Sequence, residues 1–447
     1  MDVITIEVPE LGNRTHLVHD GTHGLVVDPP RDHRPVEIAA EAAGIQIAAV
    51  ADTHVHNDYL SGALSLARRH GVDYWLSAEE RVHFDRTGVR GGDVIRVGAL
   101  DVTVLDTPGH TLHHQSFLVA DAATGSAALL SGGSLLHGTV GRTDLVDPRL
   151  ARMMGRAQWA SARRQGGLPP DTALHPTHGF GSFCAAAAGG DGFHGTLADE
   201  LRGNPALSTP RDLYVDQLVA SFGPVPAHYR RMGALNRAGA GAAPAPSPLP
   251  VTENDVHDAI RAGSWVVDVR PRHTFARGHL TGSINIEDSP QLATYAGWLV
   301  PWGADLLVIG DSEDDIASAV HDLAQIGVEV RGTHLLGPAS TWYDSRDYRV
   351  ADWAAYRRLS AGALTLDVRL DAEYAVGHLP DSVHVPLHEL EGRIPRLPPG
   401  RVWVHCKSGF RAAIAASLLA RAGRDVVLVT DDWERALEHG LPVRTAA

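Results

Sequence analysis

Residues 51–59 of the chain, ADTHVHNDY, place two histidines and an aspartate within five positions, directly after a short apolar run. The run at residues 47–51 predicts a buried strand, so His54, His56 and Asp58 are expected in the turn that follows it. Such side chains at a strand end are typical of a metal site, since neutral imidazoles bind Zn(II), Fe(II) and similar ions. A solvent-facing histidine turn is the alternative.

The length and charge of the chain limit the classes of protein to consider. Its 447 residues predict two to four domains. The formal net charge of −14 disfavours nucleic acid and anionic lipid as partners, which leaves small-molecule chemistry. The sequence shows neither a secretory signal nor a membrane-spanning run, and its two cysteines, Cys184 and Cys406, suit a reducing compartment. We therefore expect a cytoplasmic protein with no membrane partner, and a homo-oligomer remains open.

A linker and a repeat divide the sequence into domains. Residues 237–250 are rich in alanine, glycine and proline, which predicts a flexible linker after a first domain at residues 1–236. Beyond it, WVVDVR and FARGHL around Asp268 recur as LTLDVR and YAVGHL around Asp367, an offset of 99 positions (367 − 268). This domain-sized period predicts two copies of a small α/β domain with a parallel sheet, at residues 251–350 and 351–447.

The second copy contains a loop suited to nucleophilic chemistry. The apolar strand predicted at residues 402–405 runs into CKSGFR at residues 406–411, and an alanine-rich helix is predicted to follow. Backbone N–H groups of such a loop, together with the helix dipole, favour an anion and a nucleophilic thiolate at Cys406. A buried, inert cysteine is the alternative.

This second copy resembles the rhodanese, or sulfurtransferase, family. The resemblance is carried by DVR at residues 367–369, EY at 373–374, GHLP at 377–380 and the loop CKSGFR. It implies that Cys406 carries a persulfide, while an anionic sulfur donor is held by the loop amides and by Arg411. The loop residues concerned are Lys407, Ser408, Gly409 and Phe410. Cysteine phosphatases and their arsenate-reducing relatives have one more residue between cysteine and arginine.

The first copy departs from this pattern. It has Gly310 where the cysteine belongs and Asp315 near the position of the arginine, within an acidic loop. Glycine cannot carry sulfur, and the acidic residues would repel an anion. We therefore interpret residues 251–350 as a rhodanese-like domain without the activity, which docks the flanking domains.

Two further histidine turns belong with the first one. TPGHT at residues 107–111 bends after a predicted strand and presents His110, and PTHG at residues 176–179 presents His178. Together with THVHND, in this order, they resemble the metallo-β-lactamase superfamily, nearest its persulfide dioxygenase and hydroxyacylglutathione hydrolase branch. The stretch GTVGRTDL at residues 138–145 matches the persulfide dioxygenases. The implied fold class is α/β, an αβ/βα metallo-β-lactamase sandwich followed by two rhodanese-like domains with parallel sheets.

The resemblance implies one complete metal position, and the sequence departs from the family pattern at two residues. His54, His56 and His110 would hold one ion, while Tyr59 replaces a histidine and Gly133 replaces the bridging aspartate of the second position. That second position keeps Asp58 and His178 and is expected to be empty. Asp58 would then orient a bound water or a ligand. Arg142 is a candidate contact for the carboxylates of a thiol substrate, and His113, His114 and His137 are candidates to replace the lost carboxylate.

Three hypotheses for function follow. The leading one is oxidation of a low-molecular-weight thiol persulfide, such as that of glutathione, at one Fe(II), with sulfur transfer through Cys406. The second is a Zn(II)-dependent hydrolase of a thioester substrate. The third is a sulfurtransferase whose N-terminal domain only docks. One divalent metal ion is expected in the first two, with Fe(II) favoured and Zn(II) as the alternative.

Overall fold

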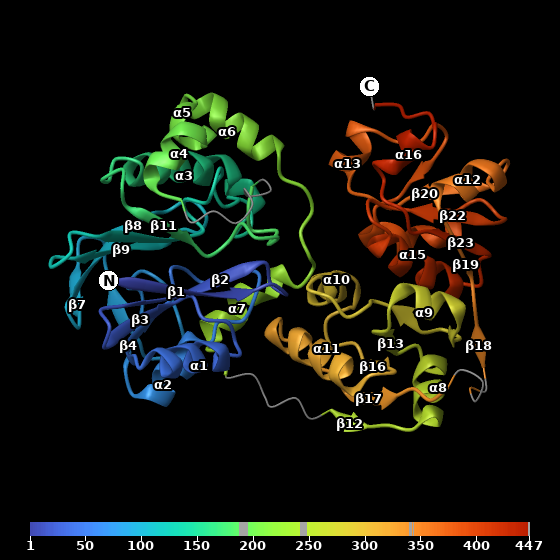
Figure 1. Cartoon of the computed structure of the whole chain (residues 1–447), viewed down its shortest axis with the longest axis horizontal. Coiled ribbons are helices and arrows are strands. Elements are labelled where there is room, and N and C mark those ends of the chain that lie inside the picture. The colour runs from blue at the N-terminus through green and yellow to red at the C-terminus, as the bar shows by residue number, and fades with distance from the viewer. Residues whose placement is uncertain (187–194, 242–247, 339–341, 343, 446–447) are drawn as a thin grey trace. The chain divides into compact units, whose positions relative to one another are not determined.

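The computed structural model of the chain describes residues 1–186, 195–241, 248–338, 342 and 344–445 (Figure 1). The chain divides into two compact units, Met1–Ala245 with Ala324–Gly327, and Pro246–Leu323 with Val328–Ala447. Residues 242–247 of the expected linker at 237–250 lie outside the described residues. None of the described helices is both long and apolar enough to cross a membrane.

Two facing sheets form the centre of the first unit. In the first sheet the strand order is β1-β2-β3-β4-β5-β6, with β1 (Asp2–Val8), β2 (Asn13–His19), β3 (His23–Val27), β4 (Gln46–Ala51), β5 (Asp73–Ser77) and β6 (Thr87–Val89). In the second the order is β11-β10-β9-β8-β7, with β7 (Val94–Val97), β8 (Leu100–Asp106), β9 (Gln115–Asp121), β10 (Ala127–Gly132) and β11 (Ala173–Pro176).

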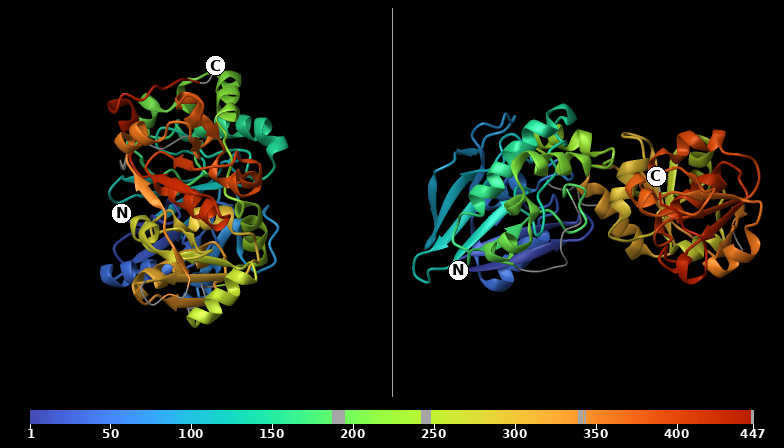
Figure 2. Two further views of the ribbon diagram at one scale, coloured as in Figure 1. Left: turned by 90° about the vertical axis from the view of Figure 1, so that its right-hand side faces the viewer. Right: turned by 90° about the horizontal axis from the view of Figure 1, so that it is seen from above.

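Helices cover the outer face of each sheet. Figure 1 shows α1 (Arg34–Ala43) and α2 (Ala63–His70) on the first sheet and α3 (Ala151–Gln165) on the second, and Figure 2 gives two further views. The remaining helices of the unit are α4 (Leu197–Gly203), α5 (Pro205–Ser208), α6 (Arg211–Ala220) and α7 (Tyr229–Ala238). This layering confirms the αβ/βα sandwich expected from the sequence.

Apolar side chains from both sheets meet between them. In β8 burial alternates along the strand, so that Leu100, Val102 and Val104 point into the sandwich, as the two-residue period of a strand requires. Phe117 of β9 packs in the same cluster with Trp75 of β5, at 6.5 Å between ring centroids. This shared core fixes the two sheets against each other, and with them the strand ends that carry the histidines.

The second unit contains the two repeated domains. The first has the strand order β12-β17-β16-β13-β15, formed by β12 (Leu249–Pro250), β13 (Trp265–Asp268), β15 (Ile284–Asn285), β16 (Leu306–Gly310) and β17 (Gly332–Leu335). The second has the order β19-β23-β22-β20-β21, formed by β19 (Arg349–Ala351), β20 (Leu364–Asp367), β21 (Val383–His384), β22 (Val402–His405) and β23 (Val426–Val429). A short antiparallel pair joins β14 (His279–Leu280) to β18 (Ser345–Arg346).

Neighbouring strands in both larger sheets of the second unit run parallel, which confirms the parallel sheets expected from the repeat. The helices of the first domain are α8 (Glu253–Arg261), α9 (Arg272–Arg277), α10 (Leu292–Leu299) and α11 (Glu313–Gln325). Those of the second are α12 (Trp353–Leu359), α13 (Asp371–Val376), α14 (Leu390–Arg393), α15 (Phe410–Arg421) and α16 (Arg435–Glu438). Because α15 begins at Phe410, two residues before the helix predicted from Ala412, Arg411 belongs to its first turn.

Phe117→Ala tests the core of the sandwich. The side chain is fully buried between the sheets, so its removal is expected to lower the free energy of unfolding of the first unit by about 3–5 kcal/mol, measured by chemical denaturation. Val94→Ala, at a position that is 63% exposed, is the control and should change it by less than about 0.5 kcal/mol. Equal effects of the two changes would contradict this assignment of the core.

Candidate functional site

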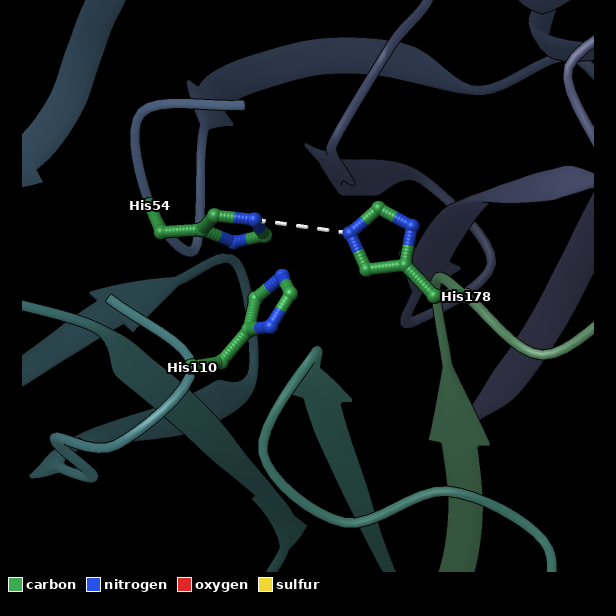
Figure 3. Close-up of side chains that lie close together, drawn as sticks. All are labelled: His54, His110 and His178. Atoms are coloured by element: carbon green, nitrogen blue, oxygen red, sulfur yellow. Dashed lines mark hydrogen bonds between the residues drawn. The ribbon is translucent and has the colours of Figure 1, made fainter. Parts of the chain in front are cut away.

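Turns at the ends of three strands bring expected histidines together (Figure 3). His54 follows β4, His110 follows β8 and His178 follows β11, so strands of both sheets contribute. The three rings are fully buried and point toward one another, and one ring nitrogen of each lies within 4.8 Å of the others. The contact from His54 Nε2 to His178 Nε2 is 3.4 Å. We call these three residues the histidine cluster.

Each ring of the histidine cluster is held at Nδ1 by an oxygen atom of the surrounding protein. The contacts are His54 to Thr53 Oγ1 at 2.8 Å, His110 to the Arg142 carbonyl at 2.7 Å, and His178 to Asn13 Oδ1 at 2.8 Å. Contacts of this kind fix the tautomer and the orientation of a ligating histidine. They leave the three Nε2 atoms to face the centre of the cluster, where a cation would be bound.

Burial keeps these rings uncharged. It lowers the pKa of His54 well below its usual range and that of His110 to about 3, and the closeness of other imidazoles, which disfavours a second positive charge, acts in the same direction. The pKa of His178 is also lowered by burial, although Asp58 opposes the effect. Neutral imidazole is the form that binds a metal ion, so the cluster does not have to lose protons first at neutral pH.

Unpartnered polar atoms test whether the site fits a metal ion. Among the described residues, the buried atoms His110 Nε2 and Asp58 Oδ1 have no hydrogen-bond partner. An unpaired buried polar atom costs about 1–3 kcal/mol, which a bound cation would offset. Imidazole nitrogens with a carboxylate nearby suit divalent zinc or iron. The residues present therefore fit a divalent metal ion.

The membership of the cluster differs from the set expected from the sequence. The sequence predicted that His56 would join His54 and His110, with His178 in a separate second position. In the structure His178 completes the cluster instead, while His56 belongs to a second group with Asp58 and again His178. His178 is thus a member of both groups.

Contacts with neighbouring carboxylates explain why the ring of His56 lies outside the histidine cluster. Its Nε2 lies 3.2 Å from Asp28 Oδ1 and 3.1 Å from the hydroxyl of Tyr59, whose ring packs on the imidazole at 4.4 Å. Burial alone would lower the pKa of His56, but the surrounding carboxylates, Asp28 first among them, raise it to about 9. The ring is therefore drawn toward Asp28. Tyr59 is itself buried, and its hydroxyl donates to the Asp28 carbonyl at 3.2 Å.

The glycine at position 133 also has a structural reason. A Cβ atom on Gly133 would lie 2.3 Å from His110 Cδ2, and one on Gly141 would lie 2.6 Å from His110 Nδ1. The imidazole of His110 thus fills the space that a side chain at residue 133 would need. An aspartate at this position and His110 in its present place exclude each other.

Two polar residues beside the cluster were missed from the sequence. Asp28 accepts hydrogen bonds from Thr53 N at 2.7 Å, from Thr53 Oγ1 at 2.8 Å and from Thr177 Oγ1 at 2.5 Å. Asn13 Nδ2 donates to Asp58 Oδ2 at 2.8 Å. Asp28 directly follows the buried strand β3, so the strand-end argument that selected His54 would have found it. No comparable signal marks Asn13.

Arg142 does not take the place expected for an anion contact. Its guanidinium donates to Asp144 at 2.7 and 2.9 Å and to the Gly223 carbonyl at 2.7 Å, and the residue is 5% exposed. Because the guanidinium of Arg142 is paired with Asp144, its charge is not available to a substrate carboxylate. What Arg142 contributes to the cluster is its carbonyl oxygen, which accepts from His110.

The additional histidines named from the sequence lie in different surroundings. His114 Nε2 accepts from the amide of Gly133 at 3.0 Å, and its ring stacks on His54 at 4.8 Å. His137 Nδ1 lies 3.4 Å from Glu200, and His113 is half-buried. Since both ring nitrogens of His114 are engaged, the second by Thr107 at 2.8 Å, it supports the cluster without offering a lone pair.

The Cys406 loop is the second candidate site. Cys406 follows β22, is 2% exposed, and precedes Gly409, whose φ of +83° is a left-handed conformation that suits glycine. A Cβ atom there would also lie 2.9 Å from Thr430 Cα. Among the described residues, the amides of Lys407, Ser408 and Gly409 donate no hydrogen bond. These amides are therefore available to an anion.

Arg411 is engaged within the protein. It makes a bidentate ion pair with Glu373 of α13, at 2.5 and 2.7 Å, instead of leaving its charge open to a sulfur donor. In the first copy, a Cβ at Gly310 would lie 3.0 Å from Val269 Cγ2, and the first turn of α11 carries the acidic residues Glu313, Asp314 and Asp315. That loop has neither a thiol nor a cationic neighbour in the corresponding turn.

Comparisons with known proteins support the fold of both units. The rhodanese-like domain model matches residues 252–336 and 351–438. A hydroxyacylglutathione hydrolase from Acidiphilium cryptum is 31% identical over 214 residues, covering 45% of this chain and 88% of that protein. A metallo-β-lactamase structure from Staphylococcus aureus is 25% identical, with a TM-score of 0.67, and the match covers 75% of this chain and 99% of that one. For ETHE1 from Myxococcus xanthus the identity is 26%, the TM-score 0.45, and the coverage 53% and 99%.

Gly133→Ala tests the packing of His110 without removing a metal ligand. The new Cβ would collide with the imidazole, so the substitution is expected to lower the metal content of the purified protein several-fold, measured by elemental analysis. Gly203→Ala, where a Cβ would meet nothing within 4 Å, is the control and should retain the metal. Full metal content in Gly133→Ala would show that the position of His110 is not needed for binding.

Proposed function

The chain belongs to the hydroxyacylglutathione hydrolase family of the metallo-β-lactamase fold and also carries two rhodanese-like domains, and from this combination we propose an enzyme that handles sulfur at two centres. A thiol persulfide would be oxidised at a metal ion held by the histidine cluster, and Cys406 would accept and pass on sulfane sulfur. The observation that carries the proposal is the presence, in one chain, of three converging imidazoles and a cysteine loop with free amides.

Fe(II) bound by His54, His110 and His178 would supply the activation of O2. The overall reaction consumes one persulfide, one O2 and one water, and yields one thiol and one sulfurous acid. The protein itself orients the ligands through the Nδ1 contacts and excludes bulk water, since the rings are fully buried. The protein thus sets the geometry of the site and the metal supplies the oxidation chemistry.

Asp58 is the group best placed to move a proton in this site. Its Oδ2 accepts from Asn13 at 2.8 Å and from Ser182 at 3.1 Å, which fixes the carboxylate and leaves Oδ1 without a partner among the described residues. Burial would raise the pKa of Asp58, but the neighbouring imidazoles of His178 and His56 and the hydrogen bonds from Asn13 and Ser182 hold it below its usual value. Asp58 would therefore be ionised and able to accept a proton from the persulfide or from water.

Sulfur transfer at Cys406 would be a thiol–persulfide exchange. The Cys406 thiolate attacks the outer sulfur of a persulfide, the sulfur–sulfur bond breaks, and the donor leaves as a thiolate while Cys406 becomes a persulfide. The amides of Lys407, Ser408 and Gly409, at the start of α15, would hold the anion. No oxidant is consumed in this exchange.

A zinc hydrolase is the second candidate, and one observation favours it. The histidine cluster contains no carboxylate, whereas iron oxygenases commonly use two histidines and one carboxylate. Three imidazoles holding Zn(II) with an open position would generate a hydroxide nucleophile for a thioester of glutathione. A docking role for the first unit, with sulfur transfer alone, is the third candidate.

Metal analysis combined with O2 uptake separates these candidates. The protein as purified is expected to contain about one iron per chain and, on addition of glutathione persulfide, to consume O2 and form sulfite. Zinc, turnover of a glutathione thioester and no O2 uptake would establish the hydrolase. Sulfur transfer by a protein that binds no metal would leave only the docking role for the first unit.

Cys406→Ser is expected to abolish sulfur transfer to cyanide and to leave O2 uptake with glutathione persulfide unchanged, because a hydroxyl is a poor acceptor of sulfur. Cys184→Ser is the matched control: burial raises the pKa of Cys184 well above its usual range, so it stays an unreactive thiol, and transfer should persist. Residual transfer in Cys406→Ser comparable to that of the unaltered protein would refute the role of Cys406.

A further inference from the structure

The turn that carries His54 and Asp58 is not held by backbone hydrogen bonds alone. Residues 54–60, which we call the ligand turn, connect β4 to α2 without forming a helix or a strand. Among the described residues, no backbone amide donates to the carbonyls of His56, Asp58 or Tyr59, although all three residues are buried. Buried carbonyls need a donor, because an unpaired one is costly. The conformation of the ligand turn therefore depends on whatever supplies these donors.

Asn236, in the last turn of α7, supplies two of them. Its Nδ2 donates to the carbonyls of His56 and Tyr59, at 2.9 Å in each case. Its Oδ1 accepts from the amide of Ser61, just beyond the ligand turn, at 2.9 Å. The side chain is 9% exposed. One buried amide group thus closes three hydrogen bonds to a segment far away in the sequence.

Two other residues bring the same helix onto the ligand turn. His228 directly precedes α7, and its Nε2 donates to the carbonyl of Asp58 at 3.1 Å. Gly233 lies in the middle of the helix, where a Cβ atom would be 2.9 Å from Asn57 Oδ1. Glycine disfavours a helix interior, so the close approach to Asn57 explains its presence. The contact between α7 and the ligand turn therefore extends along most of the helix.

Helix α7 is also the last helix before the expected linker. It ends at Ala238, and Gly239 follows in a left-handed conformation with φ +87°. The carbonyl of Arg237 accepts from the amide of His83 at 2.8 Å, and its guanidinium pairs with the buried Glu80 at 3.4 Å. The chain is thus attached to the first unit up to the point where the linker begins.

We propose that α7 positions the ligand turn for metal binding, with Asn236 as the positioning residue, and that a metal ion in the histidine cluster stabilises α7 in return. Such coupling is reciprocal: if the packed helix raises the affinity for the ion, the ion favours the packed helix by the same factor. The inference rests on the metal site of the proposed function and not on the reaction assigned to it. Metal occupancy then determines how firmly the chain is held just before the linker.

Binding of Co(II) to the metal-free, full-length protein tests the role of Asn236. Asn236→Leu keeps the size of the side chain and removes its hydrogen bonds, so Kd for Co(II) should rise about 10–100-fold and the visible absorption bands of bound Co(II) should change. Ala234→Leu, at an exposed position of the same helix, is the control and should alter neither. Co(II) binding by Asn236→Leu equal to that of the unaltered protein would overturn the inference.

Two further variants separate positioning from a general loss of stability. His228→Phe keeps a ring and removes one hydrogen bond, so it is the milder change, and Kd for Co(II) should rise about two- to tenfold. Phe117→Ala destabilises the same unit through the core between its sheets, and should leave Kd and the Co(II) spectrum unchanged. If Phe117→Ala weakened Co(II) binding as much as Asn236→Leu, stability alone would explain the effect and the inference would fail.

Hydrogen exchange of the full-length protein tests the reverse effect. Saturation with Co(II) is expected to slow amide exchange in α7, residues 229–238, and to leave α6, residues 211–220 of the same unit, unchanged. Exchange in α7 that does not respond to Co(II) would contradict the coupling. A protein that binds no Co(II) would overturn both the inference and the metal centre, whereas coupled Co(II) binding without O2 uptake would support the inference and refute only the proposed oxidation.

Discussion

The first unit depends on burying three uncharged imidazoles against one another. Burial removes the charge of the rings, and each ring presents its Nε2 lone pair only when an oxygen accepts from its Nδ1. Thr53, Arg142 and Asn13 provide those oxygens from three separate segments. The rings therefore keep their orientation only while the sheets that carry these segments remain packed together. The glycine at 133 follows from the same constraint, because the ring of His110 occupies the space beside it.

The fold and the location of the site could largely be predicted from the sequence, because apolar runs mark strands and strand ends of facing sheets gather at one edge. This placed His54, His110 and His178 correctly at turns, and the αβ/βα sandwich is confirmed. The exchange of His56 for His178 in the cluster could not be predicted. It depends on the direction of the His56 ring nitrogens, which is set by Asp28 at the end of the neighbouring strand β3, and the spacing of histidines carries no information about that direction.

The repeat likewise predicted the topology of both C-terminal domains but not how they pack. The motifs show that Cys406 begins a loop and that Gly310 ends the corresponding strand. They do not show which faces of the two α/β domains pack against each other. The hydrophobic core that the two domains share and the hydrogen bond from Arg272 to the Ser408 carbonyl arise from residues outside the family motifs. The copy without a nucleophile therefore still contributes to the packing of the other.

The size of the sulfur carrier can be argued from the two cysteines alone. Cys184 is fully buried and stays protonated, so any sulfur held covalently by a cysteine of this chain passes through Cys406. Cys406 is itself 2% exposed, so a sulfur donor has to reach a buried sulfur atom, which favours a small thiol compound over the surface of a folded partner protein. Under the function proposed above, a low-molecular-weight persulfide would be the species that visits both centres, and joining them in one chain would raise the local concentration of the acceptor around the site that releases it.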